Sequence, residues 1–406
     1  MNYALIVYAT GFFSLGIQPM NALLVPLWAV ALNAPPALLG LAVSAVSLLP
    51  ILLSISSGAL VDELGSKRVL LLCATVMALL APLYPLIPSI YALIGLQLLF
   101  GIMQSMAWIA SQTLLVGSKV QAQKPHAGTY SFASNLGTFI GPLLLGVLWD
   151  HLGPTGAFSA VSVWSGLLLL VTFLLPAAEP DGTVVQQTRF IQQLLPNWRD
   201  YRKAFSLLAI PTVVIVMYGT FLRLSSSAIR GSFYLVYLEQ LKFSATVISL
   251  LYSSIALASI FSPLFIRSFH RFLSSYQLLF LAGILAILPL CLVPLFEQFW
   301  PILGLSLLTG FGVGLTLPLL ISLLSQAVNP AEQGLAAGLR EMFNRLAATS
   351  LPFGFGVLVE GVGLQASFLI VAVLLLLPMA GFVPYSLGKR DIRGSGKRSD
   401  FKHEID

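Results

Sequence analysis

Five charged residues interrupt the long apolar runs of the second half of the sequence: Arg223, Arg230, Arg340, Glu341 and Arg345. A charge at the depth of a lipid bilayer is costly, so such residues usually mark a functional site. Four arginines against one glutamate leave an excess of three positive charges. Because a guanidinium binds carboxylate or phosphate through two parallel hydrogen bonds, this set predicts contact with an anionic group.

The arginines are expected at different depths. Arg223 and Arg230 are seven residues apart, so they share one face of a helix with about 10 Å between them along its axis. Counted from the ends of the apolar runs, Arg223 and Arg345 fall near mid-membrane and Arg230 lies further out. We expect Arg223 and Arg345 to contact an anionic cargo, with Arg230 nearer the outer mouth. The alternative is that Arg340 snorkels to the membrane surface and the others form structural hydrogen bonds.

Glu341 is the only acid deep in any apolar run. A buried carboxyl group gains or loses its proton according to its partners, so Glu341 is the predicted proton carrier. It stands four residues before Arg345, a spacing at which the two side chains can pair on one helix face. If that pair is permanent, Glu341 stays ionised and its role is structural. Both interpretations remain open from the sequence.

A stripe of neutral polar and aromatic residues follows one face of the run near residue 100: Gln97, Gly101, Gln104, Trp108 and Gln112. Its steps of four, three, four and four residues fit a helical period. Together with the charged residues it predicts a cavity with one neutral polar wall and one cationic wall. Each residue alone is better explained by a hydrogen bond between helices, and only the set as a whole indicates a cavity. Beside the arginines, the predicted substrate-binding residues are Gln18, Asn21, Gln104, Trp108, Tyr130 and Asn135.

The elements that carry these residues are predicted to be membrane-spanning helices. Of the 406 residues, 57% are hydrophobic and 9% are charged, against about 25% charged in a soluble domain. A spanning helix needs roughly 20 apolar residues. The expected spans are 4–32, 37–60, 69–87, 90–116, 128–149, 157–176, 205–238, 245–266, 275–296, 301–326, 332–358 and 364–385.

The longest polar stretch divides these twelve spans into six and six. We expect a first six-helix bundle over 1–176, a linker over 177–204, a second bundle over 205–385 and a basic tail over 386–406. Part of the linker forms either an amphipathic helix at the membrane surface or a plain tether. The expected fold class is an all-α membrane protein with two pseudo-symmetric bundles.

Basic residues predict the topology. Loops on one side, together with both tails, hold sixteen Lys and Arg residues, whereas the loops of the opposite side hold only Lys242. Basic loops stay in the cytoplasm, so both termini are expected there, in a multi-pass protein of the plasma (inner) membrane. The net charge of +6 is explained by this bias, so nucleic-acid binding is not predicted.

The two halves of the sequence resemble each other at a shift near 210 residues. The stretch 95–101 matches 304–310, and Gly11 and Phe13 match Gly219 and Phe221. A third match pairs Pro142, Gly146 and Gly153 with Pro352, Gly356 and Gly363. Duplication of a six-span unit with a site between the two copies is typical of transporters.

A short charged loop follows the second span, with Gly58, Asp62, Gly65, Lys67 and Arg68 in fixed spacing. It resembles the signature loop of the major facilitator superfamily, Gly-x-x-x-Asp-x-x-Gly-x-Lys/Arg-Arg, at all five positions. The resemblance implies a transporter that works by alternating access. It also implies a gating role for these residues, in which the loop acid holds the two halves together on the cytoplasmic side.

A second motif in the fifth span supports that resemblance. The segment from Gly137 to Gly146 looks like the Gly-x-x-x-Gly-Pro-x-x-Gly-Gly motif of proton-driven antiporters, without its last glycine. The resemblance implies a gating role for Gly141 and Pro142, and close helix packing is the alternative. Two positions depart from the drug-efflux pattern: Gln97 stands where the family has arginine, and the first span has no acid.

The leading prediction is a proton-linked exporter of an amphiphilic or anionic small molecule. The alternatives are import or exchange of an organic anion, such as a carboxylate or siderophore-like compound, and a non-transporting receptor or scaffold. We expect no cofactor, metal or enzymatic activity, because no predicted span has paired carboxylates, Cys73 and Cys291 have no metal-ligand spacing, and there is no ATP-binding loop. The expected partners are the substrate, protons and the lipid bilayer, with the protein a monomer.

Overall fold

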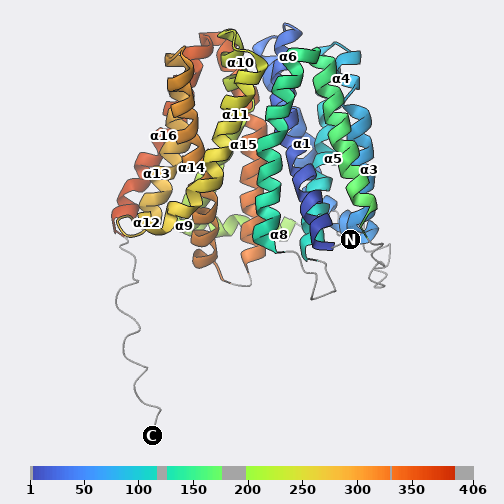
Figure 1. Cartoon of the computed structure of the whole chain (residues 1–406). Coiled ribbons are helices and arrows are strands. Elements are labelled where there is room, and N and C mark those ends of the chain that lie inside the picture. Colours follow the sequence, from blue (N-terminus) through green and yellow to red (C-terminus); the bar gives the residue numbers. More distant parts are fainter. Residues whose placement is uncertain (1–2, 117–125, 176–197, 330–331, 389–406) are drawn as a thin grey trace.

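The computed structural model describes residues 3–116, 126–175, 198–329 and 332–388. These ranges are helical and contain no strand. A first bundle consists of α1 (Tyr3–Ala31), α2 (Pro36–Leu64), α3 (Ser66–Leu80), α4 (Leu83–Leu86), α5 (Ile90–Val116) and α6 (Ala127–Phe173). The helices stand side by side (Figure 1). We call the end where α1 begins the terminal end and the opposite end the far end.

A second bundle follows the short amphipathic helix α8 (Trp198–Ser206). It consists of α9 (Pro211–Arg230), α10 (Phe233–Gln240), α11 (Ala245–Phe261), α12 (Ile266–Phe269), α13 (Ser275–Leu292), α14 (Phe299–Ala327), α15 (Gln333–Val362) and α16 (Leu364–Gly388). Most of the predicted linker lies outside the described residues, but its last residues belong to α8, which packs against α15.

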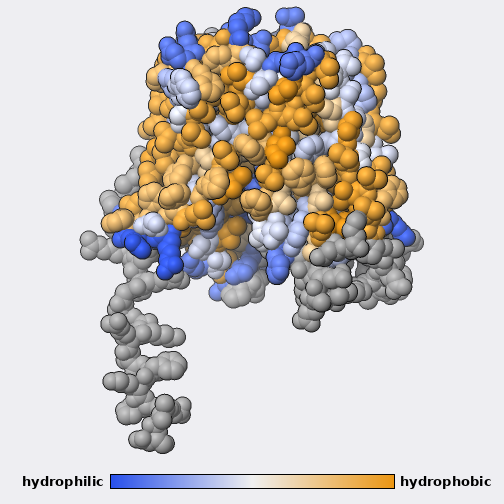
Figure 2. All heavy atoms as spheres, in the orientation of Figure 1, coloured by the Kyte–Doolittle hydropathy of each residue, from blue (hydrophilic) through white to orange (hydrophobic). Residues whose placement is uncertain are grey.

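The described helices account for twelve membrane spans. Nine are long and apolar enough to cross a membrane, and one of these, α6, holds two spans. Two shorter apolar helices, Pro36–Ile51 and Leu364–Met379, supply the rest. The surface agrees with this: a wide hydrophobic band separates hydrophilic residues at the two ends (Figure 2). The all-α fold with two six-helix bundles is confirmed.

The double span of α6 turns at a glycine. Gly153 has φ 68°, and its counterpart Gly363, between α15 and α16, has φ 82°. This left-handed conformation is strained for residues with a Cβ atom, so glycine is the natural choice for both turns. The internal repeat of the sequence is thus visible as the same sharp turn in both bundles.

Some predicted boundaries differ from the observed helices. The expected span 205–238 is broken at Ser232, whose φ of −139° and ψ of −101° are not helical, so α9 and α10 are separate helices. The Ser232 hydroxyl donates back to the Ala228 carbonyl at 2.6 Å. Likewise α11 ends at Phe261 rather than at 266, because a 3₁₀ turn containing Pro263 follows it.

The bundles meet mainly along two pairs of helices, α2 with α15 and α6 with α11, and α1 also contacts α10. These pairs are equivalent under the internal repeat. Each pair includes a contact at the far end, where Ala37 and Gly356 approach and where Gly146 approaches Ser249. The structure is therefore closed between the bundles at the far end.

Candidate substrate cavity

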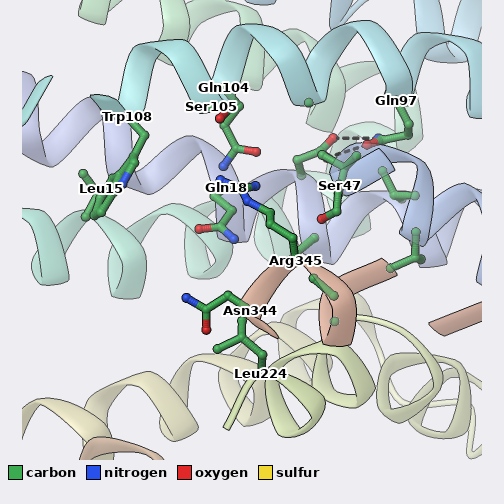
Figure 3. Close-up of a pocket in the computed structure, with 18 of the residues that line it drawn as sticks. Leu15, Gln18, Ser47, Gln97, Gln104, Ser105, Trp108, Leu224, Asn344 and Arg345 are labelled. Carbon is green, nitrogen blue, oxygen red and sulfur yellow. Dashed lines mark hydrogen bonds between the residues drawn. The ribbon is translucent and has the colours of Figure 1, made fainter. Parts of the chain in front are cut away.

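A cavity of about 320 Å³ lies between the two bundles near the middle of the spans. It is lined by α1, α2 and α5 of the first bundle and by α9 and α15 of the second. Its polar lining residues are Ser14, Gln18, Asn21, Ser47, Gln97, Gln104, Ser105, Trp108, Glu341, Asn344 and Arg345. In Figure 3 the Arg345 side chain crosses the cavity toward Gln18 and Gln104. The structure thus brings one predicted arginine to the predicted neutral stripe.

The neutral wall contains a buried hydrogen-bond network. The Asn21 amide donates to the Gln97 carbonyl oxygen at 3.0 Å, and the Gln97 amide donates back to Asn21 at 3.1 Å. Gln97 also donates to the Tyr84 hydroxyl at 3.1 Å. The side-chain amides of Asn21 and Gln97 are therefore occupied by hydrogen bonds to each other. Gln18 and Gln104 make no hydrogen bond within the described part of the chain. The latter two amides are available to a cargo.

We expect Gln97→Leu to destabilise the protein. The side chains of Gln97 and Tyr84 are buried, so the substitution leaves the polar atoms of Asn21 and Tyr84 without partners. One unsatisfied buried group costs about 1–3 kcal/mol. The measurement is thermal unfolding in detergent, and the matched variant is Gln104→Leu, whose amide has no such partners. A melting temperature that falls equally in both variants would contradict the assignment.

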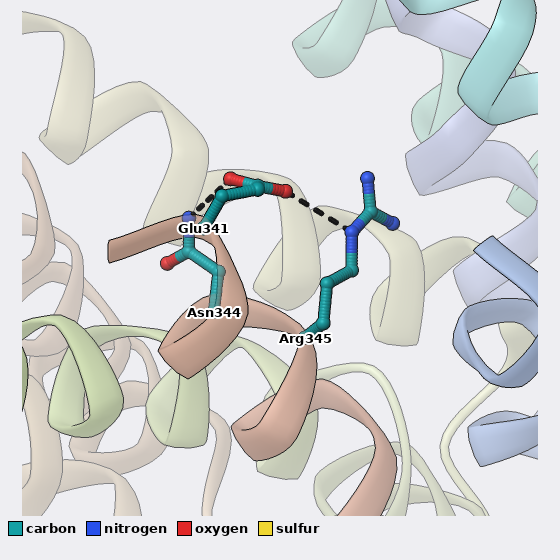
Figure 4. Close-up of polar contacts among 3 residues, drawn as sticks. All are labelled: Glu341, Asn344 and Arg345. Atoms are coloured by element: carbon teal, nitrogen blue, oxygen red, sulfur yellow. Dashed lines mark hydrogen bonds and ion pairs between the residues drawn. The ribbon is translucent and has the colours of Figure 1, made fainter. Parts of the chain in front are cut away.

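The charged wall is a cluster on one turn of α15. Arg345 Nε donates to Glu341 Oε1 at 3.0 Å, and Asn344 Nδ2 donates to Glu341 Oε2 at 2.8 Å (Figure 4). The side chains of Arg345 and Glu341 are 25% and 45% exposed, so both reach the open space. Among the described residues Arg345 uses only its Nε, which leaves its terminal nitrogens free to bind an anion.

Arg223 and Arg230 do not line this cavity. They adjoin its lining residues Leu224, on α9, and Gly231, directly after α9. The Nε atoms of both arginines are buried without a hydrogen-bond partner among the described residues. The Arg230 guanidinium lies 4.8 Å from the centre of the Tyr252 ring, a distance suited to a cation–π contact. The predicted cationic wall is thus divided, with Arg345 in the cavity and the other two arginines beside it.

Two predicted binding residues lie elsewhere. The Tyr130 hydroxyl shares a 2.7 Å hydrogen bond with Ser111, and the Tyr130 ring is buried against Gly11. Asn135 is half-buried, and its amide donates to Ser131 at 3.5 Å. Neither residue lines the cavity. These contacts are within the first bundle.

Sequence reasoning missed Asn344, which completes the cluster around Glu341. The available signal was its position three residues after Glu341, a spacing that puts both side chains on one face of a helix. It also missed Ser14, Ser47 and Ser105. Single serines in apolar runs give no signal, because they are common at helix contacts in membranes.

The sequence profile of the Major Facilitator Superfamily matches residues 5–228 and 219–402, almost the whole chain. The chain belongs to the major facilitator superfamily. It is a multi-pass integral membrane protein and a transmembrane transporter, not an enzyme.

Two relatives carry names that refer to multidrug resistance, and one of the names also refers to efflux. One is the "Multi-drug resistance efflux pump PmrA homolog" of Lactococcus lactis subsp. lactis (strain IL1403), 27% identical over 300 residues that cover 72% of this chain and 71% of the relative. The other is "Multidrug resistance protein MdtG" of Proteus mirabilis (strain HI4320), 25% identical over 284 residues that cover 68% of each protein.

Solved structures of other transporters share the fold. The nucleoside transporter NupG has a TM-score of 0.76 at 16% identity, covering 96% of this chain and 100% of its own. A bacterial homolog of the human lysosomal transporter Spinster, solved in an inward-facing and unoccupied conformation, has a TM-score of 0.72 at 13% identity. It covers 95% of this chain and 96% of its own. At these identities the similarity concerns the fold alone.

The structure describes part of the superfamily's signature loop. α2 ends at Leu64, Gly65 has φ 81°, and α3 begins at Ser66. Lys67 donates to the carbonyl of Phe173 at 3.1 Å and also to that of Leu175, at the end of α6. Arg68 is exposed. The side chain of Asp62 and the surroundings of Gly58 lie outside the described residues.

The antiporter-like segment of the superfamily lies in α6 against α1. A Cβ atom on Gly141 would lie 2.8 Å from Met20 Cγ and 3.2 Å from the Gly16 carbonyl oxygen. The adjacent Pro142 is buried inside the helix. Close packing of two helices is therefore present at this motif, and a gating role for Gly141 and Pro142 stays a prediction.

Proposed function

We propose that this transporter is a proton-coupled exporter of amphiphilic or anionic small molecules. The observation that carries the proposal is the Glu341–Arg345 pair on α15, which faces the neutral amides of Gln18 and Gln104 across one cavity. An amphiphilic cargo can rest on Trp108 and the aliphatic lining while its polar group meets these side chains. The efflux name of the Lactococcus lactis relative supports the direction of transport.

Glu341 is the proposed proton carrier. Its carboxyl group is partly exposed to the cavity and hydrogen-bonded to both Arg345 and Asn344. A cargo whose anionic group binds Arg345 and whose hydrogen-bond donor contacts the ionised Glu341 carboxylate occupies the place that a proton would take. Cargo and proton then exclude each other at Glu341, as antiport requires.

A second candidate function is import or exchange of an organic anion. It is favoured by the surplus of arginine around the cavity, where the Nε atoms of Arg223 and Arg230 are buried without hydrogen-bond partners in the described structure. In this function the cargo's charge is held by several arginines, and no proton is needed. A receptor or scaffold role is not supported, because the superfamily consists of transporters.

We further propose the orientation and organisation of the chain. The sixteen-to-one distribution of basic residues places the terminal end of the bundles in the cytoplasm and the far end outside an inner membrane. The signature loop then lies on the cytoplasmic side, where Gly58, Asp62, Gly65, Lys67 and Arg68 gate the cavity. The bundles correspond to residues 1–176 and 205–385, and the protein is a monomer.

The binding test is a thermal-shift screen on the purified protein with organic carboxylates, amphiphilic anions and amphiphilic cations. A ligand at one hundred times its Kd stabilises the folded state by about 2.7 kcal/mol. We expect anionic ligands to raise the melting temperature of the wild type, and Arg345→Ala to lose most of this rise. Arg340→Ala is the matched control, because Arg340 lies on the same helix but outside the cavity.

The direction of transport is tested in vesicles under an imposed pH gradient with the best ligand of that screen. Flux against its gradient and opposite to the proton flow supports the exporter. A flux whose rate is independent of the pH gradient and that requires an organic anion on the opposite side of the membrane supports the exchanger. Anions that stabilise the wild type and Arg345→Ala equally would exclude Arg345 as the cargo contact.

A further inference from the structure

The two bundles are joined at the far end by a carboxylate that binds a helix N-terminus. Asp150, near the turn of α6, accepts hydrogen bonds from the backbone amides of Ala245 and Thr246 at 2.9 Å and 2.8 Å. The Thr246 hydroxyl adds a third bond at 2.6 Å. All three donors lie in the first turn of α11, in the other bundle. Free amides and the helix dipole make this end of α11 attractive to a negative charge.

A second contact of the same kind joins the bundles through α15 and α2. Glu360 Oε1 accepts a hydrogen bond from the backbone amide of Ala37 at 3.1 Å. α2 begins at Pro36, which follows Pro35, and proline has no amide hydrogen. Ala37 therefore provides the first free amide of α2, and that amide is bound by an acid of the opposite bundle.

The two contacts are copies of each other under the internal repeat. Asp150 and Glu360 are 210 residues apart, and the amides of Ala37 and Ala245 are 208 apart, as expected from the repeat's shift near 210. Each acid stands three residues before the glycine of the sharp turn, Gly153 or Gly363. Each bundle thus supplies one carboxylate and receives one.

We propose that Asp150 and Glu360 are positioning residues of the transport cycle: a symmetric pair of contacts that holds the far ends of the bundles together and must break before the cavity opens there. Both carboxylates are exposed to solvent, so water can replace their partners when the contacts break. Such contacts are weak enough to reverse in each cycle, unlike a buried ion pair. The proposal goes beyond the proposed function, since it holds for any cargo and any coupling ion.

The two contacts are unequal. Asp150 accepts three hydrogen bonds from α11, whereas Glu360 accepts one from α2. We therefore expect Asp150 to contribute more to far-end closure than Glu360. The N-cap of α11 is provided separately by Ser244, whose hydroxyl accepts from Val247 at 3.3 Å. Removal of the Asp150 carboxylate therefore leaves α11 capped.

The test measures the distance between the far ends of the bundles with spin labels on the full-length protein in lipid nanodiscs without ligand. Labels at Ile87→Cys in the first bundle and Trp300→Cys in the second replace exposed side chains. The buried native cysteines Cys73 and Cys291 are replaced by alanine. We expect Asp150→Ala to raise the population of long distances about two- to fivefold. Glu360→Ala raises it less, and the double variant raises it more than either.

The matched control is Glu297→Ala, which removes an exposed acid from the same end of the molecule. It is expected to keep the wild-type distances. If Asp150→Ala does not give folded protein, Asp150→Asn and Thr246→Val weaken the same contact. Each of these variants is likewise expected to raise the population of long distances. Wild-type distances in folded Asp150 and Glu360 variants, or an equal shift in Glu297→Ala, would overturn the proposal.

Discussion

Glu341→Gln is expected to abolish transport driven by a pH gradient, with a loss of about tenfold or more. Glutamine keeps the shape of the side chain and a carbonyl oxygen for Arg345, but it cannot bind and release a proton. Transport is measured in vesicles with the best anionic ligand of the thermal-shift screen. Exchange of labelled for unlabelled ligand without a pH gradient is expected to continue, because this half-cycle requires no net proton movement.

The exchange measurement separates loss of coupling from loss of folding. Glu297→Gln is the matched control, since this acid lies at the far end and outside the cavity, and its transport is expected to equal that of the wild type. Unchanged pH-driven transport in Glu341→Gln would eliminate Glu341 as the proton carrier. The alternative, in which the Glu341–Arg345 pair is purely structural, would then remain.

Gly101→Val is expected to destabilise the first bundle by about 3 kcal/mol or more. A Cβ atom at this position would lie 2.0 Å from the Val46 carbonyl oxygen of α2. The obstacle is a backbone atom of a buried helix contact, so it cannot rotate away as a side chain would. Helices in lipid associate largely through such close packing, so separating α2 from α5 removes much of what holds them.

Gly95→Val provides the comparison within the same helix. Nothing lies within 4 Å of a Cβ atom at Gly95, so this variant is expected to melt near the wild-type temperature. Thermal unfolding in detergent and the yield of monodisperse protein are the two measurements. Equal melting of the two variants would show that the α2–α5 contact relaxes around the added side chain.

The fold could be predicted well from the sequence because each span is a predominantly apolar run of the length that a bilayer requires. The errors came where polar backbone bonding overrides hydropathy. The run containing Arg230 is one span, as predicted, but Ser232 leaves the helical conformation and divides the span into α9 and α10. Apolar composition contains no information about such a break.

The cavity could be predicted only in part. Helical spacing placed Gln97, Gln104 and Trp108 on one face, and charge indicated Glu341 and Arg345; all five line the cavity. The sequence pattern could not indicate that the Tyr130 hydroxyl forms a hydrogen bond with Ser111. It also could not indicate that Arg223 lies beside the cavity rather than in it. Such choices depend on how neighbouring helices are rotated, which one helix's periodicity does not determine.

The bonds from Lys67 to the carbonyls of Phe173 and Leu175 have a mechanical consequence. A lysine that binds the last carbonyls of a helix fixes that helix end, and here the helix end is the point where the first bundle gives way to the connection toward the second. The charged loop is therefore fastened to the base of that connection. We therefore expect any displacement of this end of α6 to displace the charged loop with it.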